Sequence, residues 1–328
     1  MFRIGMLSAT GTGKKRTIPA LLDSPICRVT VAQGRDTTKL TEISRLAPQV
    51  RVTTDLQEFA LWKDDYDIVY VASPPFLHTE QVRFALSLEK PIVCEKPLVA
   101  NRDDLGEMTA LLRDSVKPVM VAHHLRHQPV VGKLQEILKE EQLGPVSSAA
   151  LQWSFWLNHE APSATWKLDP RRGGSNAMFD AGVHALDLAL CLFGVPGRIS
   201  ALGARRREVE RLDTVSAHLG YDHSIVTIMA SQAGSTDAND LVINFAEGAV
   251  KVPAMFGERS ARTLEIHSND GRLEETFSPV NLYGAEVEDF CRHLQGESLI
   301  GTSIRDGLES ARILFAIEDA LSDSAGDT

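Results

Sequence analysis

The chain has few cysteines and no long apolar run. Its four cysteines, Cys27, Cys94, Cys191 and Cys291, lie far apart and form no C-x-x-C pair, which argues against a disulfide framework or a zinc ribbon. The apolar run at the amino end, residues 1–7, is too short for the core of an export signal or for a membrane span. These absences predict a protein of the reducing cytoplasm that makes no membrane contact.

Compositional bias and repeats are also absent. The 328 residues are 43% hydrophobic and 24% charged, which is ordinary for a folded chain and leaves little room for disorder. With 34 basic and 44 acidic residues the net charge is −10, so a large contact with nucleic acid or anionic lipid is not expected. A small polar substrate fits this charge better, and the length favours two domains.

The first third of the chain alternates short β-branched runs with longer amphipathic segments. This alternation is typical of strand-helix-strand units and a parallel sheet. We expect strands at 4–7, 28–32, 67–72, 91–94 and 118–122, and helices around 18–22, 79–88 and 105–112. The pattern ends near residue 122, so a first domain is predicted over residues 1–122.

The remainder, residues 123–328, has a different texture. Residues 147–157 and 224–231 alternate apolar and polar side chains, which predicts half-buried antiparallel strands. One helix is expected from about Ala177 to Phe193, ending at Gly194, and another over 304–321. The second domain is therefore predicted to be rich in sheet.

A glycine-poor turn follows the first expected strand. The dinucleotide pattern G-x-G-x-x-G maps onto Ser8, Thr10 and Gly13, with Gly11 between them. This is where a dinucleotide fold brings backbone N–H groups against a pyrophosphate, although an ordinary strand-to-helix turn is an equal alternative. A triphosphatase loop is excluded, because Ser8 replaces its first glycine and Lys15 its magnesium-binding hydroxyl.

The second expected strand runs into Gly34-Arg35. An acidic residue here would bind both ribose hydroxyls of NAD(H), whereas a small residue followed by arginine leaves room and counter-charge for a 2′-phosphate. The sequence predicts NADP(H) as the preferred cofactor, with NAD(H) possible. The alternative is a surface arginine in a turn.

Glu95-Lys96-Pro97, directly after the fourth expected strand, resembles a motif of the Gfo/Idh/MocA family of oxidoreductases. Other segments agree in order and spacing over nearly the whole chain. They are residues 71–75 with His78, Arg126 with Pro129, residues 166–170, residues 173–175, Asp180 and His184 with Asp187, and the late group Tyr283, Glu286 and Phe290.

The resemblance implies an α/β protein with an N-terminal Rossmann domain and a C-terminal α/β domain built on a large open, mainly antiparallel sheet. It implies hydride transfer between NAD(P) and a secondary alcohol or ketone of a sugar, amino sugar or cyclitol. Thr10 departs from the family's usual glycine or alanine, and Ser175 replaces a third glycine. The cofactor residues expected are Ser8, Thr10, Gly11, Gly13, Gly34, Arg35, Ser73, Pro74, Pro75, His78, Glu95 and Lys96.

The expected catalytic residues are Lys96, Asp180 and His184. Asp180 and His184 are four residues apart on an expected helix, so both would lie on one face. An imidazole suits the transfer of the hydroxyl proton, and Asp180 would orient it or the substrate. Lys96, at a strand end, would stabilise alkoxide charge. The alternative is a solvated edge lysine and a capping or core Asp-His pair.

Two groups resemble metal ligands. These are His123, His124 and His127, and the set Asp180, His184 and Asp187. Hydride transfer to nicotinamide needs no metal, and no functional metal is expected. Trp153, Phe155 and Trp156 are interpreted as core or subunit-contact residues, with a sugar-stacking platform as the alternative.

Other functions stay open at this point. A noncatalytic dinucleotide sensor on the same scaffold is the main alternative, and a reductase of a dihydrodiol or tetrapyrrole would differ only in its pocket. An open sheet leaves one face uncovered, so a homodimer or homotetramer is expected.

Overall fold

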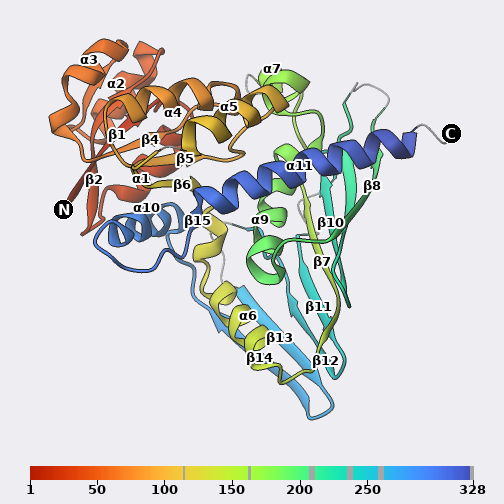
Figure 1. The fold of residues 1–328 in the computed structure, drawn as a ribbon. Helices are drawn as coiled ribbons and strands as arrows, with labels where there is room; N and C mark the ends of the chain where they lie inside the picture. The colour runs from red at the N-terminus through yellow and green to blue at the C-terminus, as the bar shows by residue number, and fades with distance from the viewer. Residues whose placement is uncertain (114, 162–163, 207–210, 235–238, 258–261, 326–328) are drawn as a thin grey trace. The chain divides into compact units, whose positions relative to one another are not determined.

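The computed structural model describes residues 1–113, 115–161, 164–206, 211–234, 239–257 and 262–325 (Figure 1). The chain forms two compact units. Unit 1 comprises Met1–His124 together with Asn281–Leu308, and unit 2 comprises Leu125–Val280 together with Glu309–Thr328. A late segment of the chain thus belongs to unit 1. The functional division expected at residue 122 stays a prediction.

Unit 1 is built on a sheet of parallel strands with one antiparallel edge strand. The order is β15-β6-β5-β4-β1-β2-β3, so the direction of strand succession reverses between β1 and β4. Ligands of open α/β sheets bind at such a reversal, beyond the carboxyl ends of the strands. The strands are β1 (Phe2–Leu7), β2 (Cys27–Gln33), β3 (Arg51–Thr53), β4 (Ile68–Val71), β5 (Ile92–Glu95), β6 (Val119–Ala122) and β15 (Thr302–Ser303). The predicted Rossmann sheet is confirmed.

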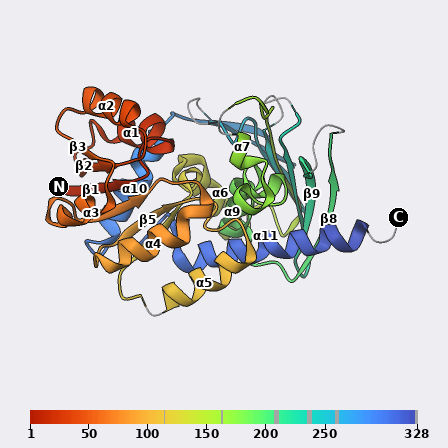
Figure 2. The same ribbon diagram turned by 90° about the horizontal axis from the view of Figure 1, so that it is seen from above.

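Helices lie on both faces of this sheet. They are α1 (Ile18–Leu21), which follows a π-helical turn at Gly13–Thr17, α2 (Thr37–Leu46), α3 (Leu56–Leu61), α4 (His78–Ser87), α5 (Arg102–Arg113), α10 (Leu282–His293) and the start of α11 (Ile304–Ala325). Figures 1 and 2 show α4 and α5 side by side. Short 3₁₀ helices occur at Lys63–Asp65, Pro75–Leu77 and His124–His127.

Helix α10 explains why the late segment joins unit 1. Its Val287 and Phe290 are buried in one core with Val93 of β5 and Met120 of β6, and α1 and α2 share this core. In Figure 1, α10 lies on the opposite side of β5 and β6 from α4 and α5. The helix therefore covers apolar sheet surface that the strand-connecting helices leave open.

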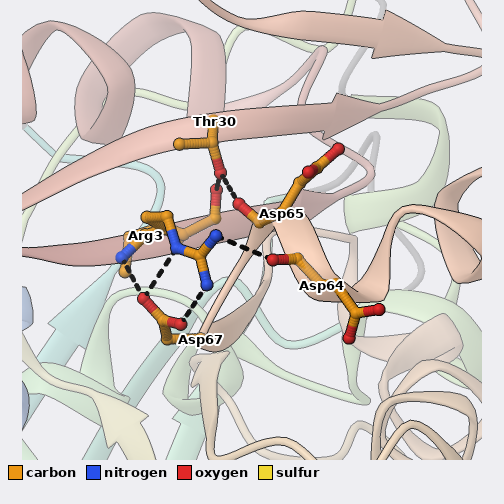
Figure 3. A network of polar contacts seen from close by, with 6 residues as sticks. Arg3, Thr30, Asp64, Asp65 and Asp67 are labelled. Atoms are coloured by element: carbon orange, nitrogen blue, oxygen red, sulfur yellow. Dashed lines mark hydrogen bonds and ion pairs between the residues drawn. The ribbon is translucent and has the colours of Figure 1, made fainter.

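Polar contacts at the other end of the strands tie β1 to the segment before β4. Arg3 donates from Nε and Nη2 to the two carboxylate oxygens of Asp67, at 3.1 and 2.6 Å, and from Nη1 to the carbonyl of Asp64 (Figure 3). The Thr30 hydroxyl of β2 donates to the carbonyl of Asp65 at 2.7 Å. These bonds hold three neighbouring strands in register at the edge away from the strand-to-helix turns.

Unit 2 is built on an eight-stranded mixed sheet in the order β14-β13-β12-β11-β7-β10-β9-β8, in which only β7 and β10 pair in parallel. This confirms the expected large, mainly antiparallel sheet. The strands are β7 (Val146–Ser154), β8 (Arg198–Ala204), β9 (Thr214–Gly220), β10 (Ile225–Ser231), β11 (Leu241–Phe245), β12 (Gly248–Val252), β13 (Arg262–Ser268) and β14 (Gly271–Phe277).

The helices of unit 2 are α6 (Pro129–Glu140), α7 (Ala164–Lys167), α8 (Pro170–Gly173), α9 (Gly182–Phe193) and the later part of α11. Helix α9 is almost wholly buried and packs on β7 and β10. Strand β9 alternates buried and half-buried residues along its length, so one face of the sheet forms the core and the other is partly exposed.

The helix expected from about Ala177 to Phe193 is in fact two elements. A 3₁₀ turn at Ala177–Phe179, capped by Asn176, is followed by α9, which begins only at Gly182. The expectation that Asp180 and His184 lie on one helix is therefore wrong. Hydrogen bonds to the Asp180 side chain from residues distant in sequence accompany this break in the helix.

Within the described residues, no helix combines the length and the apolar character that crossing a membrane requires.

Candidate active site

The turn after β1 holds Ser8 in a conformation that glycine usually adopts. Ser8 has φ 54°, in the left-handed region. Its N–H lies 3.3 Å from Oε1 of Gln33, and its hydroxyl accepts a hydrogen bond of 2.7 Å from Gln81. Two glutamine side chains thus hold the serine where the dinucleotide pattern has its first glycine.

The next residues leave backbone donors available. The N–H groups of Thr10, Gly11 and Thr12 have no acceptor among the described residues, and a Cβ on Gly11 would meet nothing within 4 Å. A Cβ on Gly13 would instead collide with the Met6 sulfur, so Gly13 allows the helical turn to pack closely on β1. Successive free N–H groups at a strand-to-helix turn are suited to binding an anion.

Thr10 packs against the end of β2. A Cβ built on Gly34 would lie 2.5 Å from Cγ2 of Thr10, so the threonine occupies the space that a side chain at position 34 would need. Arg35, the next residue, is exposed. Lys14, on the helical turn after Thr10, forms an ion pair with Glu42 of α2.

The turns after β4 and β5 are joined by a buried histidine. His78 is fully buried, with Nε2 2.9 Å from the Ser73 carbonyl and Nδ1 3.0 and 3.2 Å from the carbonyls of Pro97 and Leu98. Burial lowers the pKa of His78, against the effect of these carbonyls. The imidazole thereby fixes the turn that holds Pro74 and Pro75 next to the segment that follows Lys96.

Lys96 follows β5 directly, is half-buried and precedes a cis-proline. Glu95, the last residue of the strand, is buried and accepts a hydrogen bond of 2.9 Å from the Tyr70 hydroxyl of β4. Burial raises the pKa of Glu95, while the charge of Lys96, the Tyr70 hydroxyl and the Lys96 backbone N–H act against this rise. The carboxylate form of Glu95 is thus linked to the charge of Lys96.

In unit 2, Asp180 is the acceptor of two side chains. Lys167 Nζ lies 2.7 Å and Gln232 Nε2 lies 2.9 Å from Asp180 Oδ2. Gln232 also accepts from Arg211 at 2.9 Å through its own Oε1, and the Arg211 guanidinium bonds to the Lys167 carbonyl. Burial lowers the pKa of Arg211 to about 10, which the charges of Asp180 and Asp213 oppose. This donor set favours the ionised form of Asp180.

Two adjacent glycines allow the backbone at Lys167 to lie close to the segment that carries Asp180. A Cβ on Gly173 would lie 2.6 Å from the carbonyls of Trp166 and Lys167, and one on Gly174 would collide with the Phe179 ring. Gly174 also has φ 86°, which a side chain disfavours. The turn at 173–174 therefore lets the α7 backbone approach the start of the segment that carries Asp180.

His184 lies on the buried side of α9 and packs against an aromatic pair. Its ring centroid is 4.4 Å from that of Trp153, which stacks in turn on Phe256 at 5.2 Å. One turn along α9, Asp187 forms a buried bidentate ion pair with Arg126, at 2.8 and 2.9 Å. Trp153 therefore contacts the candidate acid/base directly, while Trp156 is 63% exposed.

Some residues around the site carry no sequence signal that points to a role. Lys167 lies inside the motif at 166–170, which does not indicate its contact with Asp180, and Gln232 lies 52 residues from Asp180 in sequence. For Tyr70 the sequence indicates only a place in a buried strand. Gln33 and Gln232 directly follow expected strands, which is a signal for a polar site, whereas their partners carry no such signal.

In the part of the chain that the structure describes, no three side chains of His, Cys, Asp or Glu come together as metal ligands. His124 instead stacks on Tyr283 with ring centroids 4.6 Å apart.

Both parts of the chain match domains of known proteins. Residues 2–123 match the model of an oxidoreductase family with an NAD-binding Rossmann fold, and residues 131–251 match the GFO/IDH/MocA C-terminal domain. D-xylose 1-dehydrogenase (NADP(+)) 2 of Haloferax volcanii is 29% identical over 98% of this chain and 96% of its own length. A dTDP-3,4-didehydro-2,6-dideoxy-alpha-D-glucose 3-reductase of Streptomyces antibioticus is 27% identical over 88% of this chain and 87% of its own length.

Solved structures share the fold. The aldose-aldose oxidoreductase of Caulobacter crescentus has a TM-score of 0.87 at 19% identity, with 98% of both chains covered. The 3-ketoreductase KijD10 of Actinomadura kijaniata has a TM-score of 0.82 at 19% identity and the same coverage. With both of these domains matched, the chain belongs to the Gfo/Idh/MocA family and is an NAD(P)-dependent oxidoreductase.

Proposed function

We propose that the protein transfers hydride between NADP(H) and a secondary alcohol or ketone of a sugar, amino sugar or cyclitol. The observation that carries this proposal is the donor set on Asp180, in which Lys167 and Gln232 hold a carboxylate four residues before His184. Relatives that span most of the chain are a xylose dehydrogenase and a dTDP-sugar reductase, which supports a carbohydrate substrate.

The residues of unit 1 fit a dinucleotide. The available N–H groups of Thr10, Gly11 and Thr12 would bind its pyrophosphate, and Gly13 allows the helical turn to lie close to β1. Arg35, exposed beyond Gly34, would pair with a 2′-phosphate, which supports NADP(H) over NAD(H). Ser73, Pro74 and Pro75 would border the nicotinamide, with His78 holding their turn.

The chemistry requires a proton to move in step with the hydride. When bound, the nicotinamide supplies or accepts that hydride. In the oxidation, we assign His184 to take the hydroxyl proton and Lys96 to stabilise the negative charge that develops on the oxygen; in the reduction, His184 returns the proton. Asp180, held by Lys167, orients the substrate hydroxyl or the imidazole.

Cofactor binding is tested before turnover, because the proposed reaction requires bound nicotinamide. Titration of the purified protein with NADPH and NADH, followed by nicotinamide fluorescence, should give tighter binding of NADPH. Turnover is then screened on keto sugars, aldoses and cyclitols with the bound cofactor. Tight binding of NADPH without turnover on any sugar would favour a sensor, and failure to bind either dinucleotide would defeat the proposal.

We also propose that the protein works in the cytoplasm as a homo-oligomer. None of the four cysteines, all of which lie in described segments, forms a disulfide, which agrees with a reducing compartment. The partly exposed face of the unit 2 sheet is the surface we expect copies to share. A monomeric mass by light scattering at micromolar concentration would contradict the oligomer.

A further inference from the structure

Two buried carboxyl groups contact one tyrosine hydroxyl behind Lys96. Tyr70 Oη lies 2.9 Å from Glu95 Oε1 and 3.5 Å from Glu286 Oε1, and all three side chains are buried. Tyr70 comes from β4, Glu95 from β5 and Glu286 from α10, the helix that the chain adds to unit 1 after completing most of unit 2. The core of unit 1 thus holds a row of three hydrogen-bonded polar side chains, which ends next to Lys96.

The two distances and the number of available protons indicate which group donates in each of these hydrogen bonds. A tyrosine hydroxyl has a single proton, and the shorter contact indicates that it is donated to Glu95. The Tyr70 hydroxyl cannot also donate that proton to Glu286, so a hydrogen bond across the 3.5 Å contact needs Glu286 as its donor. Within the described residues, the second oxygen of Glu286 has no hydrogen-bond partner, which a buried carboxylate would not tolerate but a neutral carboxylic acid can.

We propose that Glu286 is a positioning residue for the reaction proposed above: as a neutral acid it donates to Tyr70, whose hydroxyl holds the Glu95 carboxylate beside Lys96. The inference rests on the proposed function for its catalytic meaning only. Hydrogen bonds in such a chain strengthen one another, so loss of the outer donor weakens the bond from Tyr70 to Glu95.

The electrostatics of the cluster agree with this order of charges. Burial raises the pKa of Glu286 well above its ordinary value and the charge of Glu95 raises it further, while the contact with the Tyr70 hydroxyl only partly opposes this rise. Burial raises the pKa of Glu95 as well, but the charge of Lys96 and the hydrogen bond from Tyr70 act against that rise. Burial, followed by the charge of Glu95, raises the pKa of the neighbouring Cys94 thiol. The single negative charge of the cluster therefore belongs on Glu95, where it favours the protonated form of Lys96.

The test measures the reactivity of Lys96, which does not require turnover. Trace acetylation with acetic anhydride at pH 7 to 9, followed by peptide mass spectrometry, compares Lys96 with exposed Lys63 in the same sample. If Glu286→Leu weakens the hold on Glu95, more Glu95 is protonated, the pKa of Lys96 falls, and Lys96 acetylation rises severalfold. A fall of one pKa unit corresponds to about tenfold. Tyr70→Phe should have a larger effect in the same direction.

Matched variants separate a hydrogen-bond donor from a space-filling residue. Glu286→Gln keeps a donor of the same shape and should leave Lys96 acetylation at the wild-type level. Glu288→Gln, on the same helix, should do likewise, because Glu288 accepts from Ser24 and lies outside the cluster. If Glu286→Leu does not fold, Glu286→Met is used, with thermal unfolding as the check. Unchanged Lys96 acetylation in the folded apolar variant, or an equal rise in Glu286→Gln, would overturn the inference.

A second readout connects the cluster to catalysis. The acid limb of the pH profile of kcat should move to higher pH in Glu286→Leu and stay in place in Glu286→Gln, with NADPH binding unchanged in both. A wild-type chain that binds no nicotinamide would end the proposed function, whereas the acetylation pattern would still decide the role of Glu286.

Discussion

Charge placement at single residues determines the chemistry that we assign to this protein. Lys167 and Gln232 stabilise a carboxylate at Asp180, and Trp153 lies against the ring of His184. In unit 1, the Glu95 carboxylate and the positive charge of Lys96 stabilise each other. Each candidate catalytic group thus has at least one neighbour that sets its charge or its orientation, as expected where a proton must move at neutral pH.

Removal of the acid/base should reduce turnover without loss of cofactor. His184→Ala is expected to lower kcat about 10²- to 10⁴-fold, because general acid/base catalysis typically contributes this much. NADPH fluorescence titration should give an unchanged Kd, since His184 belongs to unit 2. Asp187→Asn is not a suitable control, because it breaks the buried pair with Arg126.

Lys96→Ala should also lower kcat by orders of magnitude. Near-normal turnover in both Lys96→Ala and His184→Ala would contradict the assignment of these residues.

Arg35 should decide the choice between the two dinucleotides. Arg35→Ala removes the counter-charge for a 2′-phosphate, so the Kd of NADPH should rise roughly tenfold or more, the amount expected for a lost hydrogen bond to a charged group. The Kd of NADH should stay the same. An equal loss for both dinucleotides in the fluorescence titration would mean that Arg35 does not contact the 2′-position.

The turn after β1 packs closely against the end of β2. Thr10 fills the space above Gly34, and Gly13 lets the helical turn contact β1. This pairing explains how the chain accommodates a threonine at a position that the dinucleotide pattern gives to glycine.

Gly34→Ala should therefore be destabilising, by about 1–3 kcal/mol, because the new methyl group would overlap with Thr10. The double variant Thr10→Gly with Gly34→Ala should recover much of that loss. Urea unfolding of the four members of the cycle measures the coupling between the two positions. Additive effects would show that the close approach of Thr10 and Gly34 has no energetic weight.

The stability of the folded protein should depend on pH through its buried acids. Glu286 has a raised pKa in the folded state and an ordinary one, near 4.5, when unfolded. Between these values the folded state binds the extra proton, so the free energy of unfolding falls as pH rises. The slope for one such group reaches about 1.4 kcal/mol per pH unit.

Glu286→Gln removes this titration, so its stability relative to wild type should increase as pH rises from 6 to 8. Urea unfolding at several pH values tests this, with Glu288→Gln as the matched control. Parallel pH curves for the wild type and Glu286→Gln would mean that Glu286 is already ionised in the folded state.

Features that depend on residues close together in the chain could be predicted before the structure was known. The alternation of apolar runs predicted the parallel sheet of unit 1, and motifs such as Glu95-Lys96-Pro97 and Asp180 with His184 identified the family, which the matched domains confirm. The spacing of apolar residues and the short motifs depend only on residues close together in the sequence, so they can be recognised before any tertiary contact is known.

Contacts between residues far apart in the chain became known only from the folded protein. The expected helix is interrupted at Asp180, and Lys167 and Gln232 donate hydrogen bonds to that carboxylate. Thr10 packs against Gly34, and α10 packs on the sheet of unit 1. Tyr70 and Glu286 are 216 residues apart in the chain and share a buried hydrogen bond. Such pairs arise because apolar sheet surface must be covered and buried polar groups must find partners, and both conditions are satisfied by packing rather than by local sequence.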